Sequence, residues 1–106
     1  MNDAVREIVG RLKERLVQLY GERLKGVYLF GSHAREEADA ESDIDLLIVL
    51  DYVNNYSKEI ERTSEMVAEL SLACGRSISF VYVAAERWKS EETMFLINVR
   101  EEAIPA

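Results

Sequence analysis

The sequence predicts an α/β (α+β) domain in which a small mixed sheet of three strands, or slightly more, is flanked by helices. Apolar residues recur at helical spacing in two long segments, and three short apolar stretches have the length of strands. Glycine and acidic residues separate these segments. At 106 residues the chain has the size of one domain, which we expect to span residues 1–106.

The first thirty residues predict a helix followed by a strand. Apolar side chains repeat every three or four positions over residues 5–20, which predicts a helix that covers the sheet and ends near Gly21. Residues 26–30, Gly-Val-Tyr-Leu-Phe, predict a short buried strand that ends at Gly31 and Ser32. The next segment, residues 34–38, carries a helical signal.

The second predicted strand, residues 44–50, is apolar on both faces, as expected for a central strand with structure on each side. A loop over residues 51–56 then leads into a helix from about Ser57 to Cys74, which Gly75 ends. The side chains expected on the buried side of this helix are Ile60, Met66, Val67 and Leu70.

The last part of the sequence predicts a third strand and a terminal helix. Residues 78–83 form the strand, and the connection through a helix makes it parallel to the second strand. Residues 88–103 indicate one short or broken helix, with Pro105 beyond its end. The side chains expected to face inward from it are Phe95, Leu96 and Val99.

The most informative motif lies between the first two strands. Gly31 and Ser32 are followed, after ten residues, by Asp43-Ile44-Asp45 at the start of the second strand. Side chains alternate along a strand, so Asp43 and Asp45 leave the same face, with backbone origins roughly 6 to 7 Å apart. Two such carboxylates are costly to keep without a positive charge between them, and a divalent metal is the expected occupant. The spacing suits phosphoryl or nucleotidyl transfer.

The Gly-Ser dipeptide predicts the other half of such a site. Glycine lets the backbone approach a ligand, and a helix over residues 34–38 would direct free N–H groups at an anion. Taken alone, a Gly-Ser after a strand is more often an ordinary turn, and an Asp-x-Asp is usually a solvated edge or a helix cap. The combination at this spacing is more specific than either part.

These residues resemble the signature of a known family. Residues 31–35, Gly-Ser-His-Ala-Arg, and residues 42–47, Ser-Asp-Ile-Asp-Leu-Leu, are similar to the motif of the minimal nucleotidyltransferases, the small branch of the DNA polymerase β superfamily. The resemblance covers nearly the whole chain and implies a polymerase β-like nucleotidyltransferase fold. It also implies a transfer of a nucleoside monophosphate, AMP from ATP, to a hydroxyl group with the help of Mg²⁺.

The resemblance assigns roles to individual residues. Gly31 and Ser32 would engage the triphosphate of the nucleotide, while Asp43 and Asp45 would hold Mg²⁺ and carry the catalysis. Two further nucleotide-binding candidates match the motif, namely Arg35 and Ser42. The alternative for Arg35 is an ion pair with a neighbouring acid, Glu36, Glu37 or Asp39. The only histidine, His33, would face the cleft, where we interpret it as a spectator at a variable position.

One departure from the family pattern bears on catalysis. Active members generally carry a third carboxylate near the start of the third strand, and this sequence has Ser79 there. Asp51 follows six residues after Asp45, a distance of about 20 Å along an extended strand, so it cannot easily replace the missing carboxylate. Glu86 follows the far end of a parallel strand. The general base therefore has no assigned residue.

Composition narrows the class of partner. A net charge of −7 argues against nucleic acid as the acceptor, because Lys and Arg contacts to phosphate dominate such binding. We expect a chain of this length to lack a separate substrate domain, and a partner protein or a second copy of the chain to complete the site. No apolar run is long enough to cross a membrane, and the single cysteine, Cys74, fits a reducing compartment. We expect a cytoplasmic protein.

Three functions remain open from sequence. The first is a magnesium-dependent adenylyltransferase that uses ATP, in line with family members that are antitoxins and modify a helical HEPN-type toxin on tyrosine. The second is a binding module with a decayed nucleotide site, which neutralises such a partner by contact. The third is a plain α/β domain in which the motif is coincidental.

Overall fold

The computed structural model describes residues 3–39 and 42–106 and contains the long helices and the three strands that the sequence predicts, together with a short edge strand and a divided C-terminal helix. In chain order these elements are α1 (Asp3–Tyr20), η1 (Gly21–Arg23), β1 (Leu24–Phe30), β2 (Ile44–Leu50), α2 (Tyr56–Cys74), β3 (Ile78–Ala84), α3 (Ala85–Ser90), α4 (Met94–Glu102) and β4 (Ile104–Pro105).

The sheet is mixed and has the strand order β3-β2-β1-β4. β2 is central and pairs with β1 antiparallel and with β3 parallel, as the strand–helix–strand connection predicts. β4 pairs antiparallel with β1 through Ile104 and Pro105, so the proline lies in an edge strand, where its missing N–H is tolerated. The sheet therefore has four strands, which agrees with the prediction of three strands or slightly more.

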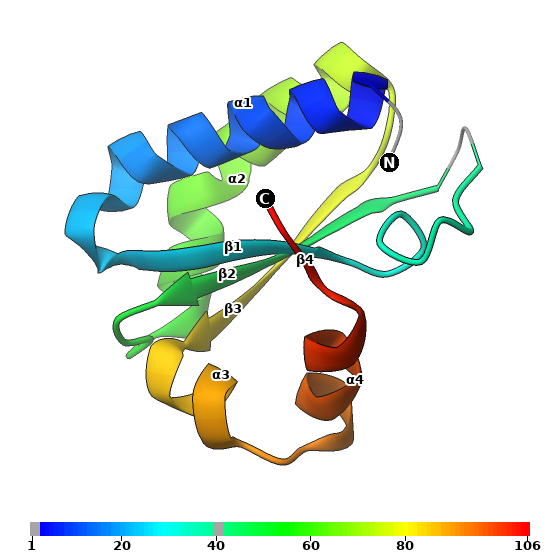
Figure 1. Cartoon of the computed structure of the whole chain (residues 1–106). Coiled ribbons are helices and arrows are strands. Elements are labelled where there is room, and N and C mark those ends of the chain that lie inside the picture. Colours follow the sequence, from blue (N-terminus) through cyan, green and yellow to red (C-terminus); the bar gives the residue numbers. More distant parts are fainter. Residues whose placement is uncertain (1–2, 40–41) are drawn as a thin grey trace.

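Helices cover both faces of the sheet. α1 and α2 lie on one face, and α3 and α4 lie on the other (Figure 1). Side-chain alternation along β2 divides the apolar residues between two cores: Leu46 and Ile48 pack with α1 and α2, whereas Leu47 and Val49 pack with α4. This double coverage explains why β2 is apolar on both faces. No helix in the described ranges has both the length and the apolar character that a membrane span requires.

The ends of α2 are fixed by local chemistry. Asn55 caps the N-terminus, because its side chain accepts a hydrogen bond of 3.3 Å from the backbone N–H of Lys58. Gly75 adopts a left-handed conformation with φ of 67° after the last turn, and its N–H donates to the carbonyl of Ser71. The predicted end of this helix at Gly75 is confirmed.

The buried side of α2 differs from the prediction at one position. Met66 and Leu70 are buried as expected, but Ile60 is 51% exposed, and its neighbours Glu59 and Thr63 face inward. The physical reason is a set of polar partners supplied by other elements. A buried carboxylate is tolerated where donors surround it, so the helix turns Glu59 inward and leaves Ile60 outside.

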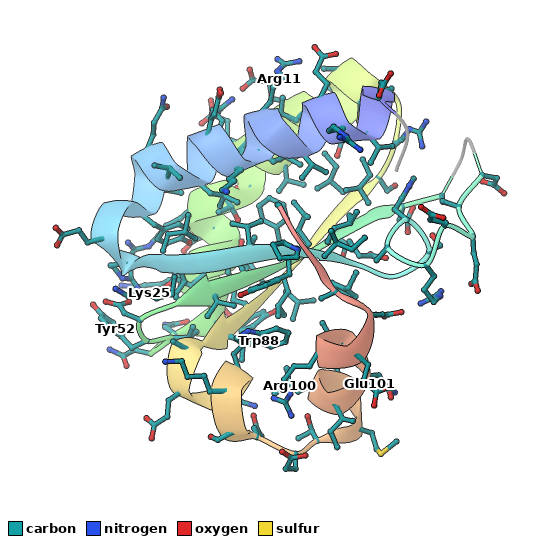
Figure 2. The ribbon with its side chains drawn as sticks, viewed as in Figure 1. Arg11, Lys25, Tyr52, Trp88, Arg100 and Glu101 are labelled. Carbon is teal, nitrogen blue, oxygen red and sulfur yellow. The ribbon has the colours of Figure 1, made fainter. Side chains whose placement is uncertain are left out.

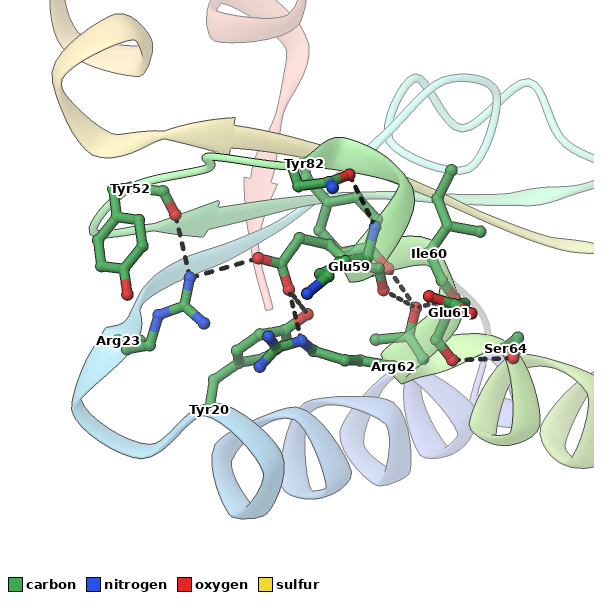
Figure 3. A network of polar contacts seen from close by, with 12 residues as sticks. Tyr20, Arg23, Tyr52, Glu59, Ile60, Glu61, Arg62, Ser64 and Tyr82 are labelled. Carbon is green, nitrogen blue, oxygen red and sulfur yellow. Dashed lines mark hydrogen bonds and ion pairs between the residues drawn. The ribbon is translucent and has the colours of Figure 1, made fainter.

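Glu59 is the centre of a polar network between α1, η1 and α2 (Figure 3). One carboxylate oxygen accepts a hydrogen bond of 2.9 Å from the hydroxyl of Tyr20, and the other accepts one of 3.3 Å from Arg23. Arg62 lies 3.5 Å from the same carboxylate. Burial and the hydrogen bond to Glu59 raise the pKa of Tyr20, which therefore stays protonated and keeps donating. The network joins α1 to α2 through the carboxylate of Glu59, both oxygens of which have partners.

The C-terminal helix is divided into two helices and begins earlier than predicted, at Ala85. α4 starts after Thr93, whose side chain caps it by accepting from the N–H of Leu96. Leu96 and Val99 are buried as expected, whereas Phe95 is 46% exposed. Phe95 meets only the edge of Phe30, with ring centroids 5.8 Å apart, because it lies at the rim of the core.

Trp88 and Arg100 hold α3 and α4 together on this face. Trp88 packs on the ring of Tyr28 with centroids 5.0 Å apart. Arg100 reaches back from α4 and donates hydrogen bonds of 2.6 Å to the backbone carbonyls of Trp88 and Glu91 (Figure 2). These contacts link α4 to α3 and α3 to β1.

We predict that Glu59→Gln lowers the free energy of unfolding by about 1 to 3 kcal/mol, because the neutral amide weakens the hydrogen bonds from Tyr20 and Arg23 and leaves two arginines facing less charge. Glu61→Gln, the same change at an exposed position on α2, is the matched control and is expected to change stability by less than about 0.5 kcal/mol. Urea denaturation at pH 7 measures both. Equal effects of the two variants would contradict the stabilising role of Glu59.

Candidate active site

The predicted motif residues lie at one end of the sheet, where β1 ends and β2 begins. Asp45 pairs with Phe30 of β1 and with Ser79 of β3. Because side chains alternate, Asp45 leaves the same face of β2 as Leu47 and Val49, which pack with α4. The carboxylates therefore open toward the side of the sheet that carries α4.

The two aspartates have free carboxylates in the part of the chain that the structure describes. Asp43 is exposed and Asp45 is half-buried, and no hydrogen bond or ion pair links either side chain to a described residue. Burial, followed by the nearby charge of Asp43, raises the pKa of Asp45, while His33 and Arg35 oppose that rise. The site thus holds two carboxylates whose charge is only weakly compensated.

Gly31 is required by a close approach to Asp45. Its φ is 76°, and a Cβ placed on it would collide with the carboxylate oxygen Oδ2 of Asp45. Any other residue would push Asp45 away from this position. The glycine of the motif and the second aspartate are therefore one geometric unit, although fourteen positions separate them in the sequence.

The segment after Gly31 forms a turn, and the predicted helix over residues 34–38 is wrong. The N–H of Arg35 donates to the carbonyl of Gly31 at 3.2 Å, and the N–H of Glu37 donates to that of Ser32 at 2.9 Å. Glu36 has a φ of 59°, which ends helical propagation, and one turn alone does not offset the cost of helix nucleation.

The turn still presents free donors to a ligand. No hydrogen bond within the described residues engages the backbone N–H groups of Ser32 and His33 or the hydroxyl of Ser32. Successive free N–H groups in a turn bind anions in the same way as a helix N-terminus. The predicted cradle at Gly31 and Ser32 is thus built from a turn in place of a helix.

Ser42 and His33 fix the loop between the strands. The hydroxyl of Ser42 accepts from the N–H of Asp39 at 3.0 Å and lies 3.2 Å from its carboxylate, so it is engaged within the loop. His33 is 4% exposed, and its Nε2 lies 3.2 Å from the carbonyl oxygen of Ser42. His33 is therefore buried and contacts the backbone of Ser42, and the hydroxyl of Ser42 is already engaged with Asp39 in this structure.

Arg35 connects the motif to α4. It pairs with Glu37 at 3.0 Å, one of the neighbouring acids named as an alternative, and with Glu102 at 2.8 Å. The other oxygen of Glu102 accepts from the N–H of Gly31 at 3.4 Å. Sequence reasoning missed Glu102. A signal exists, because the acids at the C-terminus of α4 are unfavourable beside the helix dipole unless a cation or donor meets them.

The other acids considered from sequence lie outside the site. Asp51 pairs with Arg23 at 3.1 Å, at the opposite end of β2. β3 runs parallel to β2, with Ala84 beside Leu50, so Glu86 follows the end of β3 away from Asp45. Ser79 is exposed beside Asp45, at the position predicted for a third carboxylate.

The two aspartates fit a Mg²⁺ ion that takes its remaining ligands from a bound nucleotide and water. Within residues 3–39 and 42–106, His, Cys, Asp and Glu side chains form no group of three or more that could hold a metal. Mg²⁺ commonly takes one or two carboxylates from the protein and completes its octahedron with substrate phosphates and water. Asp43 and Asp45 supply hard oxygen donors that have no partner among the described residues, and they match that donor set.

Comparison with known proteins agrees with this geometry. The model of the nucleotidyltransferase domain family matches residues 9–105. A protein of Methanocaldococcus jannaschii, MJ0604, which carries a provisional name as a protein adenylyltransferase, is 35% identical over 100 residues, or 93% of this chain and 90% of that protein.

Two solved structures share the fold at lower identity. One is a toxin–antitoxin crystal structure with AMP-PNP, at a TM-score of 0.62 and 19% identity over 90% of this chain and 69% of that one. The other is a complex of tri-AMPylated Shewanella oneidensis HEPN toxin with MNT antitoxin, at a TM-score of 0.60 and 17% identity over 95% and 70% of the two chains. With the family match and the architecture in agreement, the chain belongs to the nucleotidyltransferase domain family.

Proposed function

We propose that this nucleotidyltransferase transfers AMP from ATP to a hydroxyl group of a partner protein in a magnesium-dependent reaction. The observation that carries the proposal is the joint geometry of Gly31 and Asp45. It brings N–H groups of a turn against two carboxylates, and neither these N–H groups nor the carboxylates have a partner among residues 3–39 and 42–106. Such a site presents anion donors and metal ligands side by side, as the transfer of a nucleoside monophosphate requires.

In the proposed reaction the chain binds and orients the triphosphate. The N–H groups of Gly31 and Ser32 and the Ser32 hydroxyl bind the β and γ phosphates, and Arg35 adds a positive charge. Asp43 and Asp45 would hold Mg²⁺, which would neutralise charge on the phosphates when bound. The acceptor oxygen forms a bond to the α-phosphorus, the bond to the β-phosphate oxygen breaks, pyrophosphate leaves, and the hydroxyl proton passes to solvent.

A protein acceptor, and more specifically a HEPN-type toxin, is the partner we infer. The similar protein of M. jannaschii is named for protein adenylylation, and one structure of the same fold contains an AMPylated HEPN toxin with its antitoxin. The net charge of −7 disfavours a nucleic acid acceptor. We therefore propose an antitoxin that acts in the cytoplasm by modifying its toxin.

A second function is favoured by one observation. Ser79 lies beside Asp45, where active relatives are expected to carry a third carboxylate. The absence of a carboxylate at this position argues for slow AMP transfer. In this alternative the chain neutralises its partner by contact, and nucleotide binding is vestigial. The two functions differ in whether the aspartates are needed for protection against the toxin.

We predict that Asp43→Asn and Asp45→Asn each weaken Mg²⁺-dependent ATP binding and AMP transfer to a purified HEPN toxin by at least about a hundredfold, since each removes a charged ligand of the metal. Calorimetric titration measures binding, and incorporation of labelled AMP measures transfer. Glu86→Gln, which removes an exposed acid at the far end of β3, is the control and is expected to match the unmodified protein. Unchanged transfer in either aspartate variant would refute the metal-binding role, and protection without transfer would favour the contact mechanism.

We predict that Asp45→Asn raises the thermal midpoint of the metal-free protein by a few degrees at pH 7. The raised pKa of Asp45 means that its charged form costs folding free energy above that pKa. The cost vanishes as the pH falls below the ordinary aspartate pKa of about 4, because the carboxyl is then protonated in both folded and unfolded chains. Thermal unfolding in EDTA at pH 7 and at pH 3.5 tests this. A lower midpoint at pH 7, or a difference that grows at pH 3.5, would contradict it.

A further inference from the structure

We propose that the carboxylate of Glu102 occupies the phosphate-binding positions of the Gly31 turn when no nucleotide is bound, so that a nucleotide must displace it. Glu102 would then act as an internal competitor that sets the affinity of the site for nucleotide. This inference rests on the proposed function, because it concerns the same donors.

The contacts of Glu102 coincide with the donors proposed for phosphate. Oε1 accepts the N–H of Gly31 at 3.4 Å, and Oε2 accepts the guanidinium of Arg35 at 2.8 Å. Carboxylate and phosphate oxygens are equivalent acceptors for N–H groups and for a planar guanidinium. The single N–H of Gly31 cannot serve both at full strength, so a phosphate bound there has to move the carboxylate of Glu102.

The residues that follow Glu102 hold its backbone at this position. Glu102 is the last residue of α4, and the residues after it are fixed to β1: Ile104 pairs with Leu29, and the N–H of Ala106 donates to the carbonyl of Val27 at 2.8 Å. Figure 1 shows β4 lying across β1 directly after α4. The backbone of Glu102 is thereby held beside the turn, so displacing the carboxylate requires a movement of the side chain alone.

The negative charge of Glu102 is expected to weaken the binding of nucleotide. Glu102 adds a third negative charge near Asp43 and Asp45, and it neutralises Arg35, the cation at the cradle. Removing that carboxylate leaves the N–H of Gly31 and the Nη1 group of Arg35 available, while Glu37 still pairs with Nε of Arg35. It also lowers the repulsion of a triphosphate. We therefore expect Glu102→Gln to tighten the binding of Mg²⁺–ATP about tenfold, and to tighten the binding of metal-free tripolyphosphate at least as much.

The experiment compares two adjacent acids of α4. Glu102→Gln and Glu101→Gln remove the same charge, but Glu101 is exposed and contacts neither Gly31 nor Arg35 (Figure 2). Calorimetry titrates Mg²⁺–ATP, and separately tripolyphosphate in EDTA, into the unmodified protein and both variants. Glu102→Ala is a second variant that removes the acceptor oxygens altogether. Circular dichroism checks that each protein is folded.

The outcomes separate this inference from the proposed function. Tighter binding in Glu102→Gln and Glu102→Ala, with Glu101→Gln unchanged, supports the internal competitor. Unchanged binding in Glu102→Gln refutes it while the nucleotide site stands, and weaker binding of Mg²⁺–ATP refutes it by showing that Glu102 assists the metal. Equal tightening by Glu101→Gln reduces the effect to overall charge and also refutes it. If no protein of the set binds Mg²⁺–ATP, both the inference and the proposed function fail.

Discussion

The close approach of Gly31 to Asp45 is the constraint on which the rest of the site depends. The antiparallel pairing of β1 and β2 brings the end of one strand beside the start of the other, and only a residue without a Cβ fits against the Asp45 carboxylate. Between the two strands, the buried side chain of His33 contacts the backbone of Ser42. A turn with free N–H groups and a carboxylate pair are thus held together by the register of two strands.

The acidic side chains at the two ends of the sheet differ in whether hydrogen-bond donors surround them. At one end Glu59 is surrounded by donors from Tyr20, Arg23 and Arg62, so its charge stabilises the packing of α1 on α2. At the other end the half-buried Asp45, next to the exposed Asp43, has no hydrogen bond from the described residues, and its charge has a cost in stability that is typical of functional sites. This contrast, more than the presence of acids, distinguishes the candidate active site.

Most of the fold was predictable because local patterns and the global fold agree. β2 is apolar on both faces because helices cover both, and Gly75 ends α2 as its position predicts. The spacing of Asp43 and Asp45 places them on one face without reference to the rest of the chain. The exposure of Ile60 and the role of Glu102 could not be predicted, because the partners that decide them are distant in sequence. In α2, the polar contacts of Glu59 overrode the apolar pattern and left Ile60 exposed. In α4, Glu102 contacts Gly31, which is far away along the chain. Periodicity carries no information on such contacts.

The central claim is that nucleotide binds where the Gly31 turn meets the aspartate pair. The most direct test is an NMR titration of the ¹⁵N-labelled protein with Mg²⁺ and AMP-PNP. The account predicts that the largest amide shifts fall on Gly31, Ser32 and residues 43–45. A different cleft of about 250 Å³, lined by Arg23, Tyr52 and Lys58 among others, lies at the other end of the sheet. Shifts confined to that cleft, or no shifts at the turn under saturating nucleotide, would contradict the account.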